Sequence, residues 1–504
     1  MANSSIAAAL QDLPEVFVSD TEISREVSRA AKAGKLRKLA SRLYTRNLND
    51  APEAIIRRHV WSIVAGYFPG ALIADRTALE NGPAADGSVC LVTERGKDIA
   101  LPGLVLRPRR GVGPLPSDRP FIGGLRLSST ARAYLENMRP SRARGSLAAR
   151  TLRRQEIEER LDTLVRRAGE AAANRLRDEI RAIAPTLGLQ QEAAELDALV
   201  GSLLGTREAD LTAPAAVARR QGRPYDPDRL ALFEKLHTAL RAYPPIARLA
   251  PARSPEASTT VAFFEAYFSN FIEGTEFAVE EAAGIVFRGV IPNERPEDAH
   301  DVLGTWRVVS DPREMSQTPG DNAALVRLLR ERHAAIMEGR PDKRPGQFKE
   351  TENRAGSTIF VAPDLVGGTL EQGFDLCRSL ETPFQRAVFM MFLVAEVHPF
   401  ADGNGRTARI MMNAELVAAG EERIVIPTVY RANYLSALKA LSLVGQPEPL
   451  VRMLDYAQRW TAAVDWRSIE ETRRELEACN AFLDPLVAEG EGKRLLMPGK
   501  AAAT

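Results

Sequence analysis

Apolar residues recur at helical spacing through most of residues 256–460, which predicts a block of packed helices. One helix of this block has a clear start, because Thr382 is a favoured cap and Pro383 is tolerated at a first helical position. Its body, residues 384–397, is almost wholly apolar, so we expect it to be buried and central. A second helix is expected over residues 404–419, stopped by a glycine.

Strands are expected in few places, where short apolar runs are bounded by Gly and Pro. The strand candidates are residues 88–93, 101–106 and 357–361. Residues 107–116 are rich in Pro and Gly and are expected to form a loop. Long helices are predicted within residues 145–205, and a further helix over residues 466–483, which Pro485 closes.

These patterns predict a mostly α fold in four parts. The parts are a small α+β domain over residues 1–130, a helical arm over 131–220, an all-helical domain with a β-hairpin over 221–460, and a C-terminal helix and frayed tail over 461–504. The helical arm is also a candidate element for homodimer formation.

Composition narrows the class of protein only slightly. The 504 residues are 45% apolar and 26% charged with a net charge of +1, which is ordinary for a folded globular protein. Three cysteines without CxxC spacing (Cys90, Cys377 and Cys479) fit inert thiols in a reducing compartment. The sequence shows no basic-then-apolar leader and no apolar run near the ~18 residues that span a bilayer, so we expect a cytoplasmic protein without a membrane segment.

The segment between the two central helices carries candidate chemistry. It runs His398-Pro-Phe-Ala-Asp-Gly-Asn-Gly-Arg-Thr-Ala-Arg409. Pro399 ends the first helix, and the Gly-containing turn before the second helix leaves free backbone N–H groups at a positive helix end. Arg406 and Arg409 follow at i and i+3, so both guanidinium groups lie on one face. The segment is therefore a candidate site for more than one phosphate.

Two further residues of the segment add reactivity. Asp402 offers a hard oxygen ligand for Mg²⁺ among bound phosphates, and His398 can take a proton near neutral pH. Each residue alone has a structural explanation, since a histidine at a helix end or a Gly-Asn-Gly turn is commonly only part of the fold. The combination of base, metal ligand, anion site and paired cations within one short segment favours catalysis.

The segment resembles the signature of the Fic (Fido) family, HxFx(D/E)GNGRxxR, at every defined position. The resemblance implies a protein adenylyltransferase, which transfers AMP from ATP, with Mg²⁺, to a Tyr, Thr or Ser hydroxyl of a target protein. His398 would deprotonate that hydroxyl, Phe400 would hold the loop, and Asp402 would bind Mg²⁺. The residues implied in nucleotide binding are Gly403, Asn404, Gly405, Arg406 and Arg409, with Arg409 at the γ-phosphate.

Two other stretches resemble parts of the same family. Residues 346–349 followed by Ser357-Thr358-Ile359-Phe360 resemble the flap hairpin that holds the target chain by strand pairing. An ordinary hairpin is the alternative. Tyr434 resembles the tyrosine that lines the adenine pocket, but Leu435 and Ser442 stand where relatives often have an aromatic residue and an asparagine. These departures weaken the case for ATP specificity.

An upstream helix, residues 262–274, carries Ser269, Glu273 and Gly274 in the pattern (S/T)xxxE(G/N). Ser269 and Glu273 share one face, so the hydroxyl is expected to help orient the carboxylate. The pattern resembles the inhibitory motif of the Fic class with an intramolecular brake, in which Glu273 would pair with Arg409 in place of the γ-phosphate. A helix end with an exposed Glu is the alternative, and in some relatives such a Glu positions water for AMP removal.

Residues 20–46 predict a short helix, Gly34 and a basic strand that ends at Leu43-Tyr44. They resemble the winged-helix module of AbiEi-type antitoxin regulators, which implies DNA binding through phosphate contacts. The candidate contact residues are Lys32, Lys35, Arg37, Lys38 and Arg42. A protein-binding module or a solvated basic face are the alternatives.

Three functions follow from these resemblances. The first is a protein adenylyltransferase that Glu273 inhibits. The second uses the same Fic centre with another nucleotide or as a de-AMPylase. The third is a DNA-binding regulator or toxin–antitoxin protein whose Fic domain senses a nucleotide.

Overall fold

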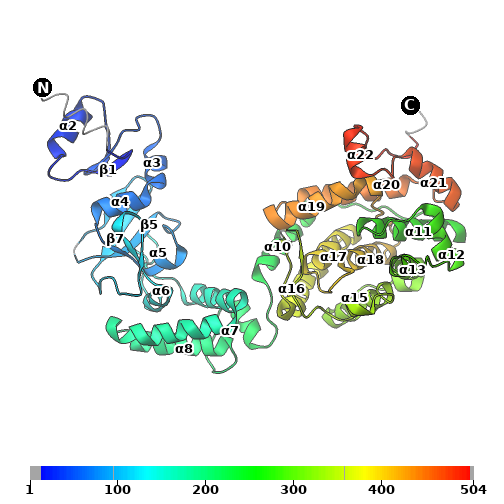
Figure 1. The fold of residues 1–504 in the computed structure, drawn as a ribbon, viewed down its shortest axis with the longest axis horizontal. Helices are drawn as coiled ribbons and strands as arrows, with labels where there is room; N and C mark the ends of the chain where they lie inside the picture. Colours follow the sequence, from blue (N-terminus) through cyan, green and yellow to red (C-terminus); the bar gives the residue numbers. More distant parts are fainter. Residues whose placement is uncertain (1–12, 95, 357, 500–504) are drawn as a thin grey trace. The chain divides into compact units, whose positions relative to one another are not determined.

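The computed structural model describes residues 13–94, 96–356 and 358–499. Ser357 of the expected flap and the end of the expected tail, residues 500–504, lie outside these ranges. The fold is mostly helical with strands near the N-terminus and one small hairpin further on, which confirms the predicted fold class (Figure 1). The chain divides into two compact units, Met1–Arg220 and Gln221–Thr504.

The first unit begins with a small sheet and one helix. Strands β1 (Val16–Val18), β3 (Leu43–Thr45) and β2 (Arg37–Ala40) pair antiparallel in that order, and α2 (Ser24–Lys32) packs on them through buried Val27. The prediction of a single basic strand that ends at Tyr44 is wrong. It is two strands, because Arg42 adopts a left-handed φ of 64° and the chain reverses there.

A six-stranded mixed sheet follows in the order β6-β7-β5-β4-β9-β8. Its strands are β4 (Leu72–Ile73), β5 (Ser88–Val92), β6 (Ile99–Leu101), β7 (Leu104–Arg109), β8 (Arg119–Pro120) and β9 (Arg126–Leu127). The strand predicted over residues 101–106 is instead a hairpin, since Gly103 turns the chain at a φ of 70°. Strand β7 therefore extends into residues that were expected to form a loop.

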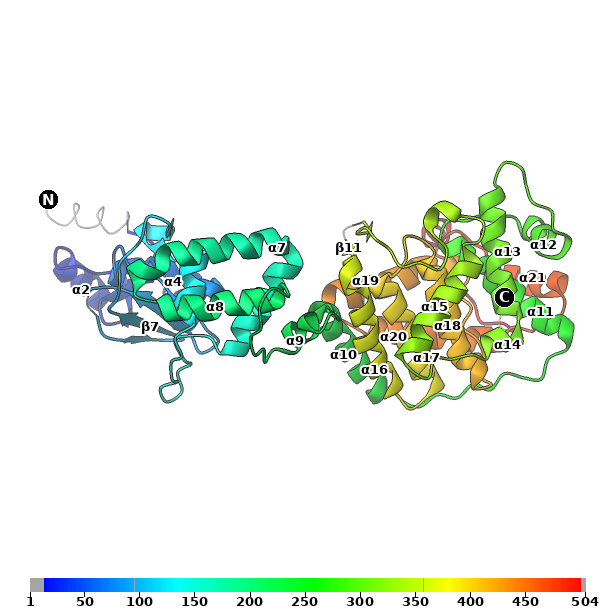
Figure 2. The same cartoon turned by 90° about the horizontal axis from the view of Figure 1, so that it is seen from below.

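Helices complete the first unit. They are α3 (Pro52–Arg58), α4 (Val60–Tyr67), α5 (Asp75–Glu80), α6 (Thr130–Asn137), α7 (Arg154–Leu187), α8 (Gln190–Leu203) and α9 (Pro214–Arg220). The long helices α7 and α8 lie side by side in both views (Figures 1 and 2) and share a buried apolar seam that includes Ile180 and Leu196. Gly188 ends α7 in a left-handed conformation, which permits the tight turn between them.

The second unit is a bundle of helices. They are α10 (Pro227–Ala242), α11 (Pro255–Ile272), α12 (Val279–Arg288), α13 (Pro296–Ser310), α14 (Pro312–Met315), α15 (Asn322–Ile336), α16 (Val366–Arg378), α17 (Pro383–Val397), α18 (Asn404–Ala418), α19 (Arg431–Val444), α20 (Glu448–Ala463), α21 (Ile469–Ala478) and α22 (Pro485–Gly490). Strands β10 (Arg354–Ala355) and β11 (Thr358–Ile359) form its hairpin. No helix among the residues placed by the structure is long and apolar enough to cross a membrane.

Helices α17 and α18 lie side by side inside this bundle (Figures 1 and 2). Thr382 caps α17 by accepting a hydrogen bond from the Gln385 backbone N–H, and the Gln385 side chain accepts one from the Thr382 backbone N–H. Nearly all of α17 is buried, as its apolar composition predicts.

The C-terminal end of the chain departs from expectation. The helix predicted over residues 466–483 is shorter, and Asn480 adopts a left-handed φ of 65° soon after α21 ends. Pro485 starts helix α22 instead of closing the previous one. Asp484 caps α22 by accepting hydrogen bonds from two backbone N–H groups, and Pro485 suits the first helical position because an N–H there would have no helical partner.

Candidate active site

The loop between α17 and α18 has an unusual backbone. His398 lies at the C-terminal cap of α17 with a left-handed φ of 52°, a conformation that is uncommon for a non-glycine residue. Gly403 is also left-handed, at 72°, and α18 starts at the next residue. The Asn404 side chain accepts from the Phe400 N–H and donates to the Phe400 carbonyl, both at 2.8 Å. Asn404 therefore holds the loop closed through its side chain.

A histidine that the sequence analysis did not identify packs against this loop and supports it. His333 on α15 is fully buried and stacks on Phe400, with ring centroids 3.7 Å apart and planes within 1°. Its Nδ1 accepts from the Gly346 N–H at 2.9 Å, so Nε2 carries the proton and donates to the Asp402 carbonyl at 3.0 Å. Burial lowers the pKa of His333 to about 4, which keeps the ring neutral.

The imidazole of His398 is poised as a base. Its Nδ1 donates to the Ala395 carbonyl at 3.1 Å, which leaves the Nε2 lone pair available. The Phe360 ring stacks on the His398 ring, with ring centroids 3.7 Å apart and planes within 5°. Burial lowers the pKa of His398 to about 4, so the ring is neutral at pH 7 and can accept a proton.

Arg409 reaches from α18 to the end of α11. Its Nη2 donates to Glu273 Oε1 at 2.7 Å and to the Ser269 carbonyl at 2.8 Å, and its Nε donates to Ser269 Oγ at 3.0 Å. The expectation that the Ser269 hydroxyl orients the Glu273 carboxylate is not what the structure shows. The hydroxyl accepts a hydrogen bond from the arginine and so positions Arg409 instead.

Glu273 is the C-terminal cap of α11, and Gly274 follows with a φ of 93°. The Arg431 side chain donates to the Ile272 carbonyl at 2.9 Å, which fixes this helix end. A Cβ added to Gly405 would run into the Glu273 carboxylate. The carboxylate therefore lies over the N-terminal turn of α18, at the place where the sequence predicts bound phosphate.

Arg406 has a partner that the sequence did not reveal. Its Nη1 lies 2.8 Å from Asp301 Oδ2 on α13, and both side chains are almost fully buried. Asp301 also pairs with Arg340 at 2.9 Å. Nothing in the spacing of a lone Asp on a predicted helix could have marked it, because its partner stands 105 residues further along the chain.

Two buried side-chain donors of this site are unsatisfied within the described residues. Arg409 Nη1 and Arg406 Nε are buried and make no hydrogen bond within the described part of the chain. Buried donors without partners are costly, and anionic oxygens would satisfy both. These orphaned donors therefore fit a phosphate-bearing ligand.

Asp402 is the expected Mg²⁺ ligand, and it is half-buried in the loop. Its Oδ1 accepts from the Gly403 N–H at 2.7 Å. No group of three or more His, Cys, Asp or Glu that could hold a metal occurs among the residues described. A single carboxylate fits Mg²⁺, because this ion is commonly bound by one or two carboxylates together with substrate phosphates.

Tyr434 is buried on α19 with its ring beneath Arg409, whose Cζ lies 5.8 Å from the ring centroid. Of the two departures near it, Ser442 donates a hydrogen bond to Glu396 Oε2 at 2.5 Å. Leu435 packs, partly buried, against the main apolar core. Both residues thus have structural partners of their own.

A hairpin, β10–β11, lies where the flap is expected, although its first strand is Arg354–Ala355 and not the segment at 346–349. That segment packs instead on the loop between α17 and α18, where the Lys349 N–H donates to the Pro399 carbonyl at 2.9 Å. Thr358 and Ile359 form the second strand, and Ile359 is 61% exposed. Phe360 follows directly and covers His398.

The basic residues near the N-terminus fall into two groups. Lys32, Lys35 and Lys38 are exposed. The two arginines are engaged in the fold, because Arg37 donates to the Asp50 carbonyl at 3.0 Å and Arg42 donates to the Ser19 carbonyl at 2.9 Å. The lysines are therefore the better candidates for phosphate contacts.

Comparison with known proteins finds similarity over the part of the chain that carries this site. Residues 325–416 match the Fic/DOC family. The protein adenylyltransferase fic-1 of Caenorhabditis briggsae is 26% identical over 195 residues, which cover 38% of this chain and 38% of that protein. The protein adenylyltransferase Fic of Drosophila erecta is 32% identical over 209 residues, covering 38% and 40%. The chain thus spans about two fifths of the length of these relatives.

Among solved structures, Fic-1 of Caenorhabditis elegans aligns with 65% of this chain and 97% of its own, at 16% identity and a TM-score of 0.33. The stretch that matches the family spans α15, which carries His333, and the loop from His398 to Arg409. Residues 325–416 therefore match the Fic/DOC family, and part of the chain is similar to distant Fic protein adenylyltransferases.

Proposed function

We propose that this chain is a protein adenylyltransferase, which moves AMP from ATP to a hydroxyl side chain of a target protein, and that Glu273 holds it inactive at rest. One observation carries the proposal: the Glu273 carboxylate binds Arg409 and lies over Gly405, where anionic oxygens of a nucleotide would otherwise bind. The relatives named as protein adenylyltransferases support the choice of reaction.

The reaction needs a base and a place for charge. His398 Nε2 would accept the proton of the target hydroxyl while its oxygen forms a bond to the α-phosphorus of ATP and pyrophosphate leaves. The N-terminal turn of α18, Arg406 and Arg409 would neutralise the phosphates. Asp402 would hold Mg²⁺, which supplies further neutralisation of phosphate charge when bound. Catalysis would thus rest on positioning and electrostatics.

Inhibition by Glu273 is expected from its charge and from its position in the site. A carboxylate and a γ-phosphate are both anions, so Glu273 and ATP compete for the Arg409 guanidinium. The Glu273 side chain is one third exposed while that of Arg409 is nearly buried. The carboxylate can therefore withdraw toward solvent when the end of α11 moves, whereas Arg409 stays in the core.

The test is incorporation of labelled AMP into the protein itself. Glu273→Gly should raise auto-AMPylation at least tenfold over the intact protein, since removing the carboxylate frees Arg409. Parallel reactions with labelled GTP, CTP and UTP decide which nucleotide is used, and Glu273→Gly combined with His398→Ala is the negative control. An unchanged or lower rate in Glu273→Gly would contradict the proposal.

A second activity has its own observation. Only Oε1 of Glu273 binds Arg409, and Oε2 makes no hydrogen bond in the structure as described. That oxygen can orient a water molecule, which would let the same site remove AMP. The experiment incubates the AMPylated Glu273→Gly protein with intact protein and measures free AMP. Release that depends on Glu273 supports de-AMPylation, and no release excludes it for this substrate.

A further inference from the structure

We infer that Arg229 is a positioning residue that holds the flap, defined as β10, β11 and Phe360, against helix α17, at whose end His398 lies. The inference rests on the proposed function, because the flap matters only if a target chain is modified. Arg229 lies on α10, far from the signature loop in sequence, and no feature of the motif points to it.

The guanidinium of Arg229 joins two parts of the site. Its Nη1 contacts Glu396 Oε1 on α17, and its Nη2 donates to the Ile359 carbonyl of β11 at 2.5 Å. Glu396 is buried, stands two residues before His398, and accepts a second hydrogen bond from Ser442. Arg229 therefore connects the flap backbone to the helix that ends at the base.

A second set of contacts holds the other side of the flap. Asn353 donates from Nδ2 to the Phe400 carbonyl at 2.9 Å and accepts from Lys349 Nζ at 2.6 Å. The Phe360 N–H donates to the Asn353 carbonyl at 3.2 Å. The flap is thus tied to the catalytic loop at Asn353 and to helix α17 through Arg229.

The contacts of Arg229 and Asn353, the two anchors of the flap, fix its position, because the hairpin cannot hold that position alone. Its two strands have two residues each, and a hairpin of this size is not stable in isolation. When both anchors hold, the Phe360 ring lies flat on His398. The same geometry leaves Ile359 exposed at the flap, where a target segment can pair with the strand.

The arginines of the site would therefore have different roles. Arg409 and Arg406 act on the nucleotide, whereas Arg229 acts on the side from which the hydroxyl arrives. Loss of Arg229 should leave nucleotide binding intact and misplace both Phe360 and the His398 ring. A displacement of about 1 Å at a reacting group costs roughly 100-fold in rate.

The experiment compares Arg229→Ala with the parent in the Glu273→Gly background. Auto-AMPylation should show a kcat lower by about tenfold to 100-fold and an unchanged KM for ATP. Hydrogen exchange should rise in peptides that cover the flap and stay unchanged in α18. Arg229→Lys should restore part of the kcat, because its ammonium can still donate to the Ile359 carbonyl or to Glu396.

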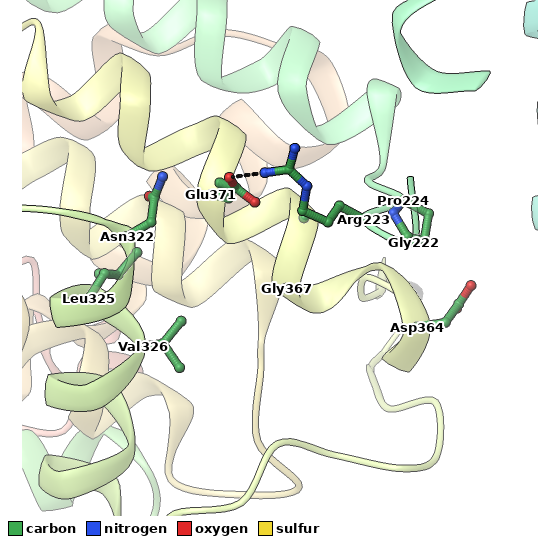
Figure 3. Close-up of a pocket in the computed structure, with 10 residues that line it drawn as sticks. Gly222, Arg223, Pro224, Asn322, Leu325, Val326, Asp364, Gly367 and Glu371 are labelled. Carbon is green, nitrogen blue, oxygen red and sulfur yellow. Dashed lines mark hydrogen bonds and ion pairs between the residues drawn. The ribbon is translucent and has the colours of Figure 1, made fainter. Parts of the chain in front are cut away.

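Two further variants keep the result unambiguous. Arg229→Ala leaves Glu396 buried without its cation, so Arg229→Ala with Glu396→Gln removes that charge and should recover stability without recovering kcat. Arg223→Ala is the matched control, since Arg223 pairs with Glu371 at 2.9 Å on the surface of the same unit (Figure 3) and should change neither readout.

Unchanged exchange in the flap of Arg229→Ala would overturn the inference, as would a raised KM for ATP with an unchanged kcat. If the Glu273→Gly parent shows no activity with any nucleotide, the proposed function fails. The exchange comparison between the intact chain and its Arg229→Ala variant then still decides whether Arg229 holds the flap.

Discussion

The Arg409 guanidinium donates three hydrogen bonds, two to Ser269 and one to Glu273, and its remaining Nη1 has no partner among the residues described. A buried cation of this kind needs a counter-charge. Glu273 supplies it at rest, and a nucleotide phosphate would supply it in the active state. The same pairing therefore stabilises the fold and, under the proposed function, would also inhibit the enzyme.

This double role gives a prediction for Glu273→Gly in the absence of nucleotide. The variant should melt about 2–4 °C below the intact protein, the shift that about 1 kcal/mol causes in a unit of this size. Mg²⁺ and ATP should raise its melting temperature well above the rise seen for the intact protein, because ATP no longer competes with the carboxylate. Equal nucleotide shifts in a thermal-shift assay would argue against Glu273 as the competitor.

Asp301 compensates Arg406 in the same way, but more deeply in the core. Asp301→Asn leaves the buried Arg406 cation without its counter-charge, which we expect to lower the free energy of unfolding by about 3 kcal/mol. Urea unfolding followed by tryptophan fluorescence measures it, since three of the four tryptophans (Trp306, Trp460 and Trp466) lie in the second unit.

The control for this experiment shares a partner with Asp301. Glu297 pairs with Arg340 at 3.0 Å, yet its side chain is 61% exposed. Glu297→Gln should therefore change the free energy of unfolding by about 0–1 kcal/mol. Equal effects of the two substitutions would show that Arg406 does not depend on Asp301.

At the scale of elements, three helices and one loop make the site. Helix α17 presents His398 at its end, α18 presents both arginines and the turn proposed to bind phosphate, and α11 carries Glu273, the proposed brake. Helix α15 braces the loop through His333, whose stacked ring contacts Phe400. The loop conformation consequently depends on a neutral histidine in the core.

That dependence predicts how stability changes with pH. The pKa of His333 falls to about 4 on folding, from an unfolded value near 6.5, so the unfolded chain binds more protons between these values. The contribution of neutral His333 to the free energy of unfolding should be fully present above pH 6.5. It should decline by about 3 kcal/mol as pH falls toward 4. His333→Gln should show a shallower decline in urea midpoints measured across this range. A slope equal to that of the intact protein would refute the assignment.

At the scale of the whole molecule, the chain has two units with separate cores. The second unit contains every residue of the candidate active site. The first unit contains the small sheet with α2 and the exposed lysines near it. A regulatory role for the first unit is a natural extension of the proposed function, and DNA is the ligand that its resemblance suggests.

DNA binding is tested with the full chain in gel shifts against the promoter of its own operon. If the first unit binds DNA, a shift at low salt should weaken steeply as salt rises, because phosphate contacts release counterions. Replacing Lys32, Lys35 and Lys38 together by Ala should abolish the shift without changing the circular dichroism spectrum. A shift that survives the triple replacement places the contacts elsewhere, and no shift at low salt excludes DNA binding.

The sequence by itself was sufficient for features that depend on near neighbours. The cap at Thr382, the burial of α17 and the start of α18 follow from local chemistry, and the structure confirms them. The family signature and the brake pattern are also local strings, so Glu273 could be proposed as the partner of Arg409 before the two were seen in contact. The turns at Arg42 and Gly103 were missed, because each lies inside a run whose composition is typical of one continuous strand.

Only the tertiary structure decided which distant groups meet. Asp301 with Arg406, His333 with Phe400 and Arg229 with Glu396 join residues that are far apart in the chain. Such contacts arise where helices cross, and they leave no period or spacing in the sequence. The local strings therefore determine the chemistry available to this protein, whereas the packing of the helices determines which of those groups are paired, covered or left open to a ligand.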